Sequence, residues 1–197
     1  MLKKIVKKSI YWKIYFQNQI ILISNKENGG LNMEIKFTIP GAPKGKGRPR
    51  VSIRKFKGSD GKDKTFTKTY TPEDTVIYEN LIKLEYQNAC NNFKFNNEAC
   101  LEMEIMAFYP IPKSTTKKKL KLMLWNVLRP IKKPDADNVG KVVADSLNEI
   151  AYKDDTQITD LIIRKRYSDV PRVEVRIKDL SDELEIEKNI LEKEEKK

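Results

Sequence analysis

The stretch KPDADNVGKVVADSLNEIAYKDDTQI, residues 133–158, holds six carboxylates in a chain that is otherwise strongly basic. Apolar residues recur at helical spacing from about Asn138 to Glu149, which predicts an amphipathic helix. The polar run AYKDD, residues 151–155, predicts a loop, and TQITDLIIRKRYS, residues 156–168, predicts a strand. The stretch therefore predicts a helix, a loop and a strand that carry a cluster of acids between them.

Outward from this stretch, three further segments alternate as strands do: EIKFTI (34–39), LEMEIMAFYPI (101–111) and RVEVRI (172–177). The segment TPEDTVIYENLIKLEYQNACNNF, residues 71–93, predicts a helix with Thr71 as its cap and Pro72 at the first helical position. Residues 113–133 contain eight basic residues and no acid, and they predict a short helix followed by a surface loop.

The composition suits one basic domain with extensions. The chain has 197 residues, of which 39% are hydrophobic. Lysine and arginine number 39 against 28 acids, a net charge of +11 that indicates nucleic acid or an anionic membrane surface as a partner. The chain has no histidine, which excludes the usual catalytic triads and an ordinary zinc site. Cys90 and Cys100 make no disulfide framework, so we predict reduced thiols in a cytoplasmic protein.

Both ends of the chain are predicted to be extensions of a domain at 33–178, which keeps 29 basic against 19 acidic residues. The tail, 179–197, is charged and helix-like, and a solvated helix is its default interpretation. The apolar run within 1–32 is interrupted and falls short of the ~20 apolar residues of a spanning helix. Gly29-Gly30 can be encoded by a ribosome-binding sequence two codons before Met33. We therefore expect a translated leader at 1–32, and an intact mass that includes these residues in the natively expressed protein would refute it.

The acidic cluster of the opening stretch comprises Asp135 and Asp137 at the mouth of the predicted helix, Asp145 further along it, and Asp154 with Asp155 in the loop. Asp137, Lys141 and Asp145 follow at steps of four, so they share one face of the helix. Acids within a DNA-attracting surface repel the substrate phosphates unless a cation lies between them. Mg²⁺ prefers such hard oxygen ligands and supports phosphodiester hydrolysis, so we predict a magnesium site.

A structural interpretation of the same acids stands beside this one. Acids at a helix start complement the helix dipole, Asp137 and Lys141 are spaced as an ordinary ion pair, and YKDDTQ is also typical of a polar turn. Context favours the metal site, because the acids lie within a basic chain that otherwise suits a polyanion.

The stretch resembles the signature of the RusA-type Holliday-junction resolvases: P-D-x-D-N, a lysine three residues after the Asn, a downstream Asp and a D-D-x-Q turn. FTIPGAPKGKGRPR (37–50) and LEMEIMAFYPIPKS (101–114) are similar to the amino-terminal half of the same family, so the resemblance spans about residues 34–178. It implies a small α+β domain with a mixed β-sheet packed with helices, which forms a homodimer. It also implies a magnesium-dependent endodeoxyribonuclease that resolves four-way DNA junctions by paired symmetric nicks in recombination and repair. The family often travels with phages.

When the family motif is carried onto this sequence residue by residue, the resemblance implies the following site residues. The metal-binding carboxylates are Asp135, Asp137 and Asp155, with Asp154 as a weaker candidate, and the essential basic residue is Lys141. The predicted catalytic set is therefore Asp135, Asp137, Lys141 and Asp155. Asn138 and Asp145 match the family pattern in supporting roles.

The DNA grip is predicted from basic residues on a glycine-interrupted backbone, namely Lys44, Lys46, Arg48 and Arg50. The alternative is a solvated basic loop. The surrounding segment 44–68 has ten basic and two acidic residues and predicts a strand or a hairpin that turns near residues 58–61. Lys117 to Lys119 with Lys121 are further candidate DNA contacts, with a solvated helix face as the alternative. Phe108, Tyr109 and Trp125 are candidates to touch unstacked bases, although aromatic residues are more often core.

Three rival functions remain open at this point. A nuclease of the PD-(D/E)xK type also uses acids and a lysine, but it places the second acid and the lysine on a strand, whereas this segment predicts a helix. A catalytically inactive protein that only binds branched DNA is expected to have lost an acid or the lysine, and all are present here. A basic structural protein explains the charge but not the acids.

Overall fold

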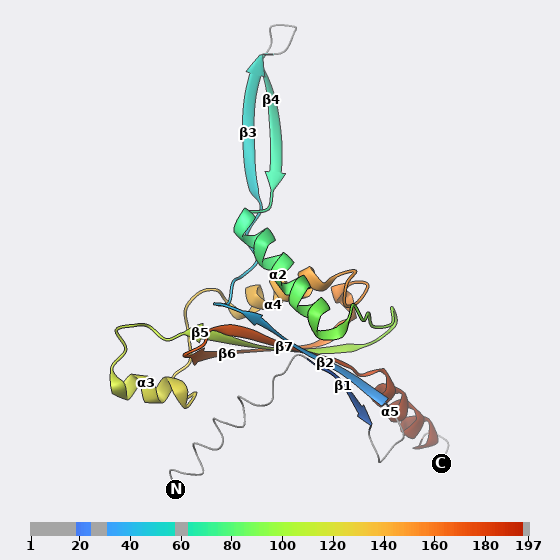
Figure 1. Cartoon of the computed structure of the whole chain (residues 1–197). Helices are drawn as coiled ribbons and strands as arrows, with labels where there is room; N and C mark the ends of the chain where they lie inside the picture. The colour runs from blue at the N-terminus through green and yellow to red at the C-terminus, as the bar shows by residue number, and fades with distance from the viewer. Residues whose placement is uncertain (1–18, 25–30, 58–62, 195–197) are drawn as a thin grey trace.

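The computed structural model describes residues 19–24, 31–57 and 63–194 of the chain. Two helices cover one face of a five-stranded mixed sheet, and a two-stranded hairpin projects from the domain (Figure 1). The predicted α+β class, with a mixed sheet packed with helices, is confirmed. Residues 1–18 and 25–30 of the predicted extension, the predicted hairpin turn at 58–61 and the end of the tail, 195–197, lie outside the described residues.

The sheet has the order β1-β2-β7-β5-β6. Its strands are β1 (Gln19–Ser24), β2 (Leu31–Pro40), β5 (Leu101–Pro110), β6 (Ile158–Ser168) and β7 (Arg172–Asp179). β5 and β6 run parallel, and the other described neighbours are antiparallel. β7 comes last in the sequence but lies between β2 and β5. Its Lys178 lies opposite Glu34 of β2, and its Asp179 lies opposite Leu101 of β5.

Alternation along the strands decides which face of the sheet becomes the core. In β5 every second residue is buried, starting at Leu101, and the residues between them are half-exposed. The buried apolar residues of β2, β5 and β7 form one core with Tyr78, Ile82 and Tyr86 of α2 (Glu73–Cys90) and with apolar residues of α4 (Ala136–Leu147). The rings of Phe37 and Tyr86 meet edge to face at 5.5 Å.

The other face of the sheet is polar and is joined by ion pairs across the strands. Arg176 in β7 reaches Glu104 at 3.0 Å and Glu34 at 3.3 Å, and it also pairs with Glu102. Glu104 pairs with Arg164 of β6 as well. Charged side chains at the alternate positions therefore link four of the strands on the side opposite α2 and α4.

The helices agree with the predicted ones to within a few residues. The predicted cap at Thr71 is wrong, because α2 begins at Glu73 and Pro72 occupies the cap position without a side-chain hydrogen bond. The other helices are α3 (Lys117–Leu124), capped by Thr116, α4, which starts two residues before the predicted Asn138, and α5 (Ser181–Glu194) in the predicted helical tail. Among the described helices, none is long and apolar enough to cross a membrane.

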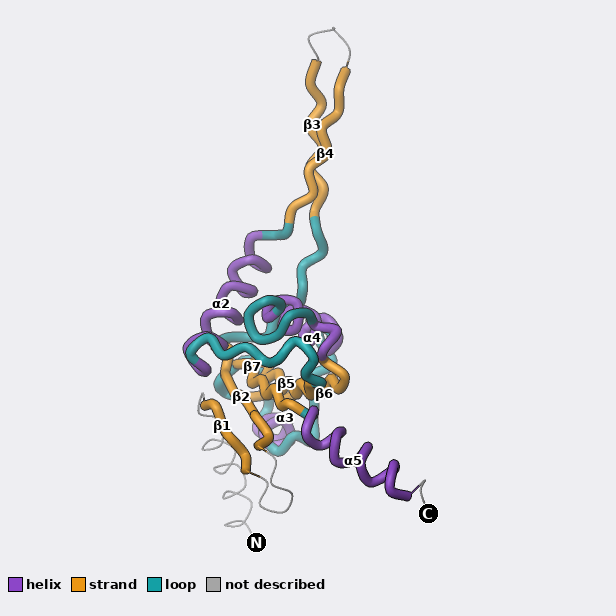
Figure 2. Tube along the Cα trace, turned by 90° about the vertical axis from the view of Figure 1, so that its right-hand side faces the viewer, coloured by secondary structure: helices purple, strands orange, loops and turns teal. Residues whose placement is uncertain are grey.

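Two features lie outside the predicted core. β1, within the predicted extension, pairs with β2 along its whole length, from Gln19 opposite Lys36 to Ser24 opposite Leu31. The predicted hairpin is formed by β3 (Arg50–Lys57) and β4 (Asp63–Tyr70), which pair with each other and extend away from the sheet beyond α2 (Figure 2).

Candidate active site

Helix α4 presents the first acids of the motif at its start. Asp135 occupies the N-cap position, and its backbone carbonyl accepts a hydrogen bond from the Val139 N–H at 3.1 Å. Its carboxylate makes no capping hydrogen bond within the described part of the chain. Asp135 and, in the first turn, Asp137 are both exposed. The structure thus gives Asp135 no capping role, and its carboxylate remains available for a ligand.

Two side chains of the sheet hold the segment that leads into α4 by hydrogen bonds to its backbone carbonyls. The Tyr109 hydroxyl donates to the Pro134 carbonyl at 2.7 Å, and Lys165 Nζ donates to the Lys132 and Pro134 carbonyls at 2.6 and 2.9 Å. Burial, followed by the nearby charge of Asp135, raises the pKa of Tyr109 to about 12, so the hydroxyl stays a donor. Tyr109 is buried in the core, so it does not present its ring to unstacked bases as the sequence allowed.

The glycine-interrupted loop packs directly against the start of α4. The Lys46 N–H donates to the Asn138 carbonyl at 3.2 Å. A Cβ on Gly45 would lie 2.6 Å from Asn138 Nδ2 and 3.0 Å from Pro134 Cβ, so a side chain fits there only if Asn138 or the loop shifts. This contact carries Arg48, from a segment far away in sequence, to the same place as Asp135.

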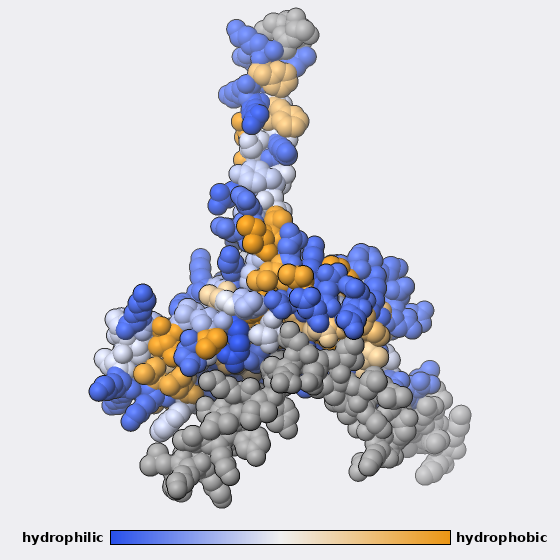
Figure 3. Space-filling view, in the orientation of Figure 1, coloured by the Kyte–Doolittle hydropathy of each residue, from blue (hydrophilic) through white to orange (hydrophobic). Residues whose placement is uncertain are grey.

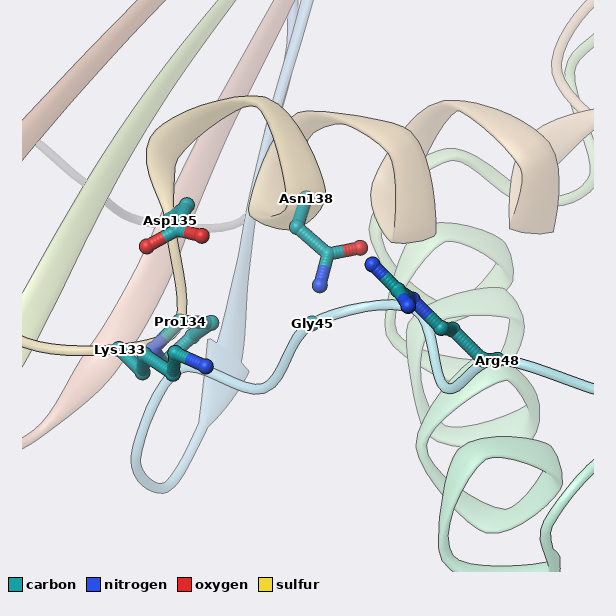
Figure 4. Close-up of a pocket in the computed structure, with 6 residues that line it drawn as sticks. All are labelled: Gly45, Arg48, Lys133, Pro134, Asp135 and Asn138. Atoms are coloured by element: carbon teal, nitrogen blue, oxygen red, sulfur yellow. The ribbon is translucent and has the colours of Figure 1, made fainter.

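A pocket forms at this junction. It is lined by Gly45, Arg48, Lys133, Pro134, Asp135 and Asn138 (Figure 4). The side chains of Arg48 and Asn138 point toward one another over the loop, and Asp135 stands at the first turn of the helix (Figure 4). The pocket therefore combines two cations, which suit a phosphate, with one carboxylate.

Lys46 lies in the same loop but has a different environment. Its Nζ is 2.6 Å from Glu79 Oε1 of α2 and 3.1 Å from Asp145 Oδ2 of α4. Burial lowers its pKa, but the hydrogen bonds and charges of the two carboxylates outweigh this, so the net pKa is raised. The structure therefore places this predicted phosphate contact in an internal ion-pair bridge between two helices.

Three further acids, Asp145 of α4 with Asp154 and Asp155 of the turn that follows it, lie near a buried tyrosine. The Tyr152 hydroxyl donates to the Ala144 carbonyl at 2.8 Å. Burial, followed by the charges of Asp155, Asp145 and Asp154, raises its pKa. These three carboxylates therefore lie within electrostatic reach of one residue.

The structure distinguishes the two acids of the turn. Asp154 caps the short 3-10 helix η1 (Asp155–Gln157) by accepting a hydrogen bond from the Thr156 N–H at 3.0 Å. That bond is the main cause of its lowered pKa. Asp155 is half-buried, and within the described residues it forms no ion pair. Of the pair, Asp155 is the acid that caps no helix, and its side chain lies within hydrogen-bonding reach of Asp154.

The other predicted residues are placed as follows. Lys141 is exposed on α4, and the ion pair with Asp137 that its spacing allows is absent from the described residues. Lys44 Nζ lies 5.8 Å from the ring centre of Tyr78, and Arg50 is exposed at the start of β3. Where the structure is described, no three acidic or cysteine side chains come close enough together to hold a metal ion.

Sequence reasoning missed three residues of this site. Lys133 lines the pocket and directly precedes the Pro-Asp motif, so its position in the sequence was a usable signal. Glu79 holds Lys46 and Tyr152 supports the second group of acids. Glu79 carries no local signal, because its partner Lys46 lies in a distant segment, whereas Tyr152 lies directly beside the Lys153-Asp154-Asp155 turn of the motif.

Comparison with known proteins gives two matches. The profile of the family described as Endodeoxyribonuclease RusA matches residues 40–178. A protein of Bacillus subtilis (strain 168), named only as uncharacterized protein YqaN, is 38% identical over 149 residues. That similarity covers 75% of this chain and 97% of the Bacillus protein.

Proposed function

The chain belongs to the RusA family of endodeoxyribonucleases, and on this basis we propose that it resolves four-way DNA junctions by paired, symmetric nicks that require Mg²⁺. The observation that carries the proposal is the pocket at the start of α4. It holds the uncapped carboxylate of Asp135 beside the cations of Arg48 and Lys133. A phosphodiester backbone needs cations to bind it and acids to hold the metal that assists its hydrolysis.

The chemistry of the donors suits a hard divalent cation, and the carboxylates would have to move together to hold it, because no three of them are grouped within the described residues. The proposed ligands are Asp135, Asp137 and Asp155, and the chain has no histidine to favour a softer metal. Asp135 and Asp137 are exposed, so their side chains can turn toward an ion at small cost. Magnesium bound there would supply positive charge at the scissile phosphate and promote the ionisation of water.

The protein side chains have separate proposed roles. Arg48 and Lys133 bind the phosphate that enters the pocket, and Lys141, one turn along α4 from Asp137, stabilises negative charge as the nick forms. Asn138 positions the loop by way of its backbone carbonyl. Asp154 is the weaker ligand, because its carboxylate already caps η1.

The symmetry of the substrate supports a homodimer. A four-way junction has a two-fold axis, so a C2 dimer would place one site on each of two opposed strands. The strand arrangement of the PD-(D/E)xK nucleases has no counterpart here, because Asp137 and Lys141 lie on helix α4.

The test is cleavage of a synthetic four-way DNA junction by the purified full-length protein, with Mg²⁺ or with EDTA, beside a linear duplex. The Asp137→Asn variant is compared with Asp182→Asn, which removes the same charge from an exposed position on α5, outside the family match. We expect symmetric nicks with Mg²⁺ for the wild type and for Asp182→Asn, and binding without cleavage for Asp137→Asn. Tight junction binding without cleavage under any divalent metal would refute the nuclease activity and indicate a protein that only binds DNA.

A further inference from the structure

The β3–β4 hairpin has the surface of a ligand-binding element. Neither strand pairs with the central sheet, and every residue of β3 and β4 except Ser52 is exposed. The exposed residues include five large hydrophobic side chains, Val51, Ile53, Phe56, Phe66 and Tyr70. An isolated two-stranded hairpin is marginally stable in water, and exposed apolar surface of this kind marks an interaction site.

The register of the hairpin sorts its side chains onto two different faces. Residues directly opposite each other in an antiparallel pair point to the same side, and successive pairs alternate. One face holds the pairs Arg50–Tyr70, Ser52–Lys68, Arg54–Phe66 and Phe56–Lys64. Within β3 and β4 this basic-aromatic face has four cations, three aromatic rings and no acid.

The opposite face has another character. Val51 and Ile53 lie opposite Thr69 and Thr67, followed by Lys55 opposite Thr65. The acid of these strands, Asp63, belongs to this side and lies opposite Lys57 at the tip. Figure 3 shows hydrophobic and hydrophilic side chains interleaved along the described part of the projection.

The hairpin starts at the pocket. Arg48 lines the pocket, and β3 begins two residues later with Arg50 on the basic-aromatic face. Eight residues per strand extend about 25 Å from that point. DNA bound in the pocket therefore has a continuous row of cations available beside it.

Resting on the proposed function, we propose that the basic-aromatic face binds DNA at a branch point, with its cations on phosphates and its aromatic rings against unstacked bases. Charge decides the kind of partner, since the two strands carry six basic residues against one acid. Each ring lies opposite a cation, an arrangement that suits a strand whose phosphates and bases are both exposed. Continuous duplex offers the phosphates but hides the base faces. The hairpin therefore selects branched DNA over linear duplex.

Three variants test this in an Asp137→Asn background, with fluorescence anisotropy on a four-way junction and on a linear duplex of equal length. The aromatic variant combines Phe56→Ala, Phe66→Ala and Tyr70→Ala. The cation variant combines Arg54→Gln, Lys64→Gln and Lys68→Gln. The matched control, Val51→Ala with Ile53→Ala, removes apolar surface from the opposite face of the same hairpin.

The aromatic variant should bind the junction at least tenfold more weakly, since each stacked base is worth roughly 5- to 100-fold. Its duplex binding should change less than threefold. The cation variant should weaken both and lower the salt dependence by about one unit of slope for each lost phosphate contact. The control should bind as the parent does.

Several results would overturn the inference. Unchanged junction binding by the aromatic variant, or an equal loss in the control, would remove the DNA contact from this face. A shift from dimer to monomer in the aromatic variant, measured by light scattering, would reassign the face to a second copy of the chain. If the parent protein shows no preference for the junction, the proposed function fails first. If the parent prefers the junction and the aromatic variant keeps that preference, the proposed function stands and this inference alone is refuted.

Discussion

Replacing Lys46 with methionine separates two roles that one cation can have. The sequence predicts that Lys46 binds DNA phosphates, whereas the structure pairs it with Glu79 at 2.6 Å and Asp145 at 3.1 Å. Methionine keeps an unbranched apolar stem but leaves both carboxylates without their cation. If the bridge is the main role, Lys46→Met should lower the stability of the fold more than the affinity for DNA.

The size of the effect follows from burial. Breaking a buried ion pair costs about 3–5 kcal/mol, and an exposed pair is worth about 1 kcal/mol or less. The side chains of Lys46, Glu79 and Asp145 keep 28%, 18% and 23% of their exposure, so the cluster lies between these limits. We expect a loss of about 2 kcal/mol, which lowers the melting temperature by roughly 4–8 °C in a domain of this size.

The assay is a double-mutant cycle followed by a comparison with Arg48. In a Glu79→Gln background the loss from Lys46→Met should shrink, because one of the two stranded charges is already gone. Arg48→Gln should behave in the opposite way, since Arg48 lines the pocket and has no ion-pair partner among the described residues. It should leave the melting temperature unchanged and lower the salt slope of junction binding by about one. A Lys46→Met protein with normal melting and tenfold weaker DNA binding would refute this reasoning.

Three shorter predictions concern the same site and the sheet. Gly45→Ala should reduce single-turnover junction cleavage by about a hundredfold, because its Cβ would lie 2.6 Å from Asn138 Nδ2 and displace the loop; unchanged cleavage would contradict the close packing. Asp155→Asn should abolish cleavage while Asp154→Asn retains it within a few-fold, since Asp154 is occupied as a cap, and equal losses would show that both acids are needed. Burial raises the pKa of Glu174 above 4.5 despite its ion pair with an arginine, so wild-type stability should fall as pH rises above that value. Urea unfolding from about pH 4 to pH 7 should show this decline relative to Glu174→Gln, and a constant difference would exclude it.

Local patterns were enough to predict most of the elements. Period-two alternation identified β5 because every second residue from Leu101 is buried, and helical spacing identified α4 to within two residues. Alternation states that one face of a strand is buried but does not name the element that covers it. The strand order and the position of β7 therefore had no local signal.

The sequence predicted most residues of the candidate site but did not predict which of them lie together. Asp135 and Arg48 were both predicted, but only the contact of Gly45 with Asn138 brings them to one pocket. Asp135 lines this pocket, whereas Asp145, Asp154 and Asp155 lie near Tyr152, although the sequence suggested one cluster. Such divisions depend on side-chain partners from distant segments, and spacing along one helix does not contain that information.

The central position of β7 also determines the order in which the sheet can assemble. Because β2 and β5 are joined through the last strand of the domain, the sheet has a gap in its middle until residues up to Asp179 are available. On the ribosome the chain must therefore be synthesised through Asp179 before its core closes, and such late, long-range pairing makes folding slow. A truncated product that lacks β7 would have β2 separated from the strands beneath α4, so incomplete synthesis yields no assembled nuclease.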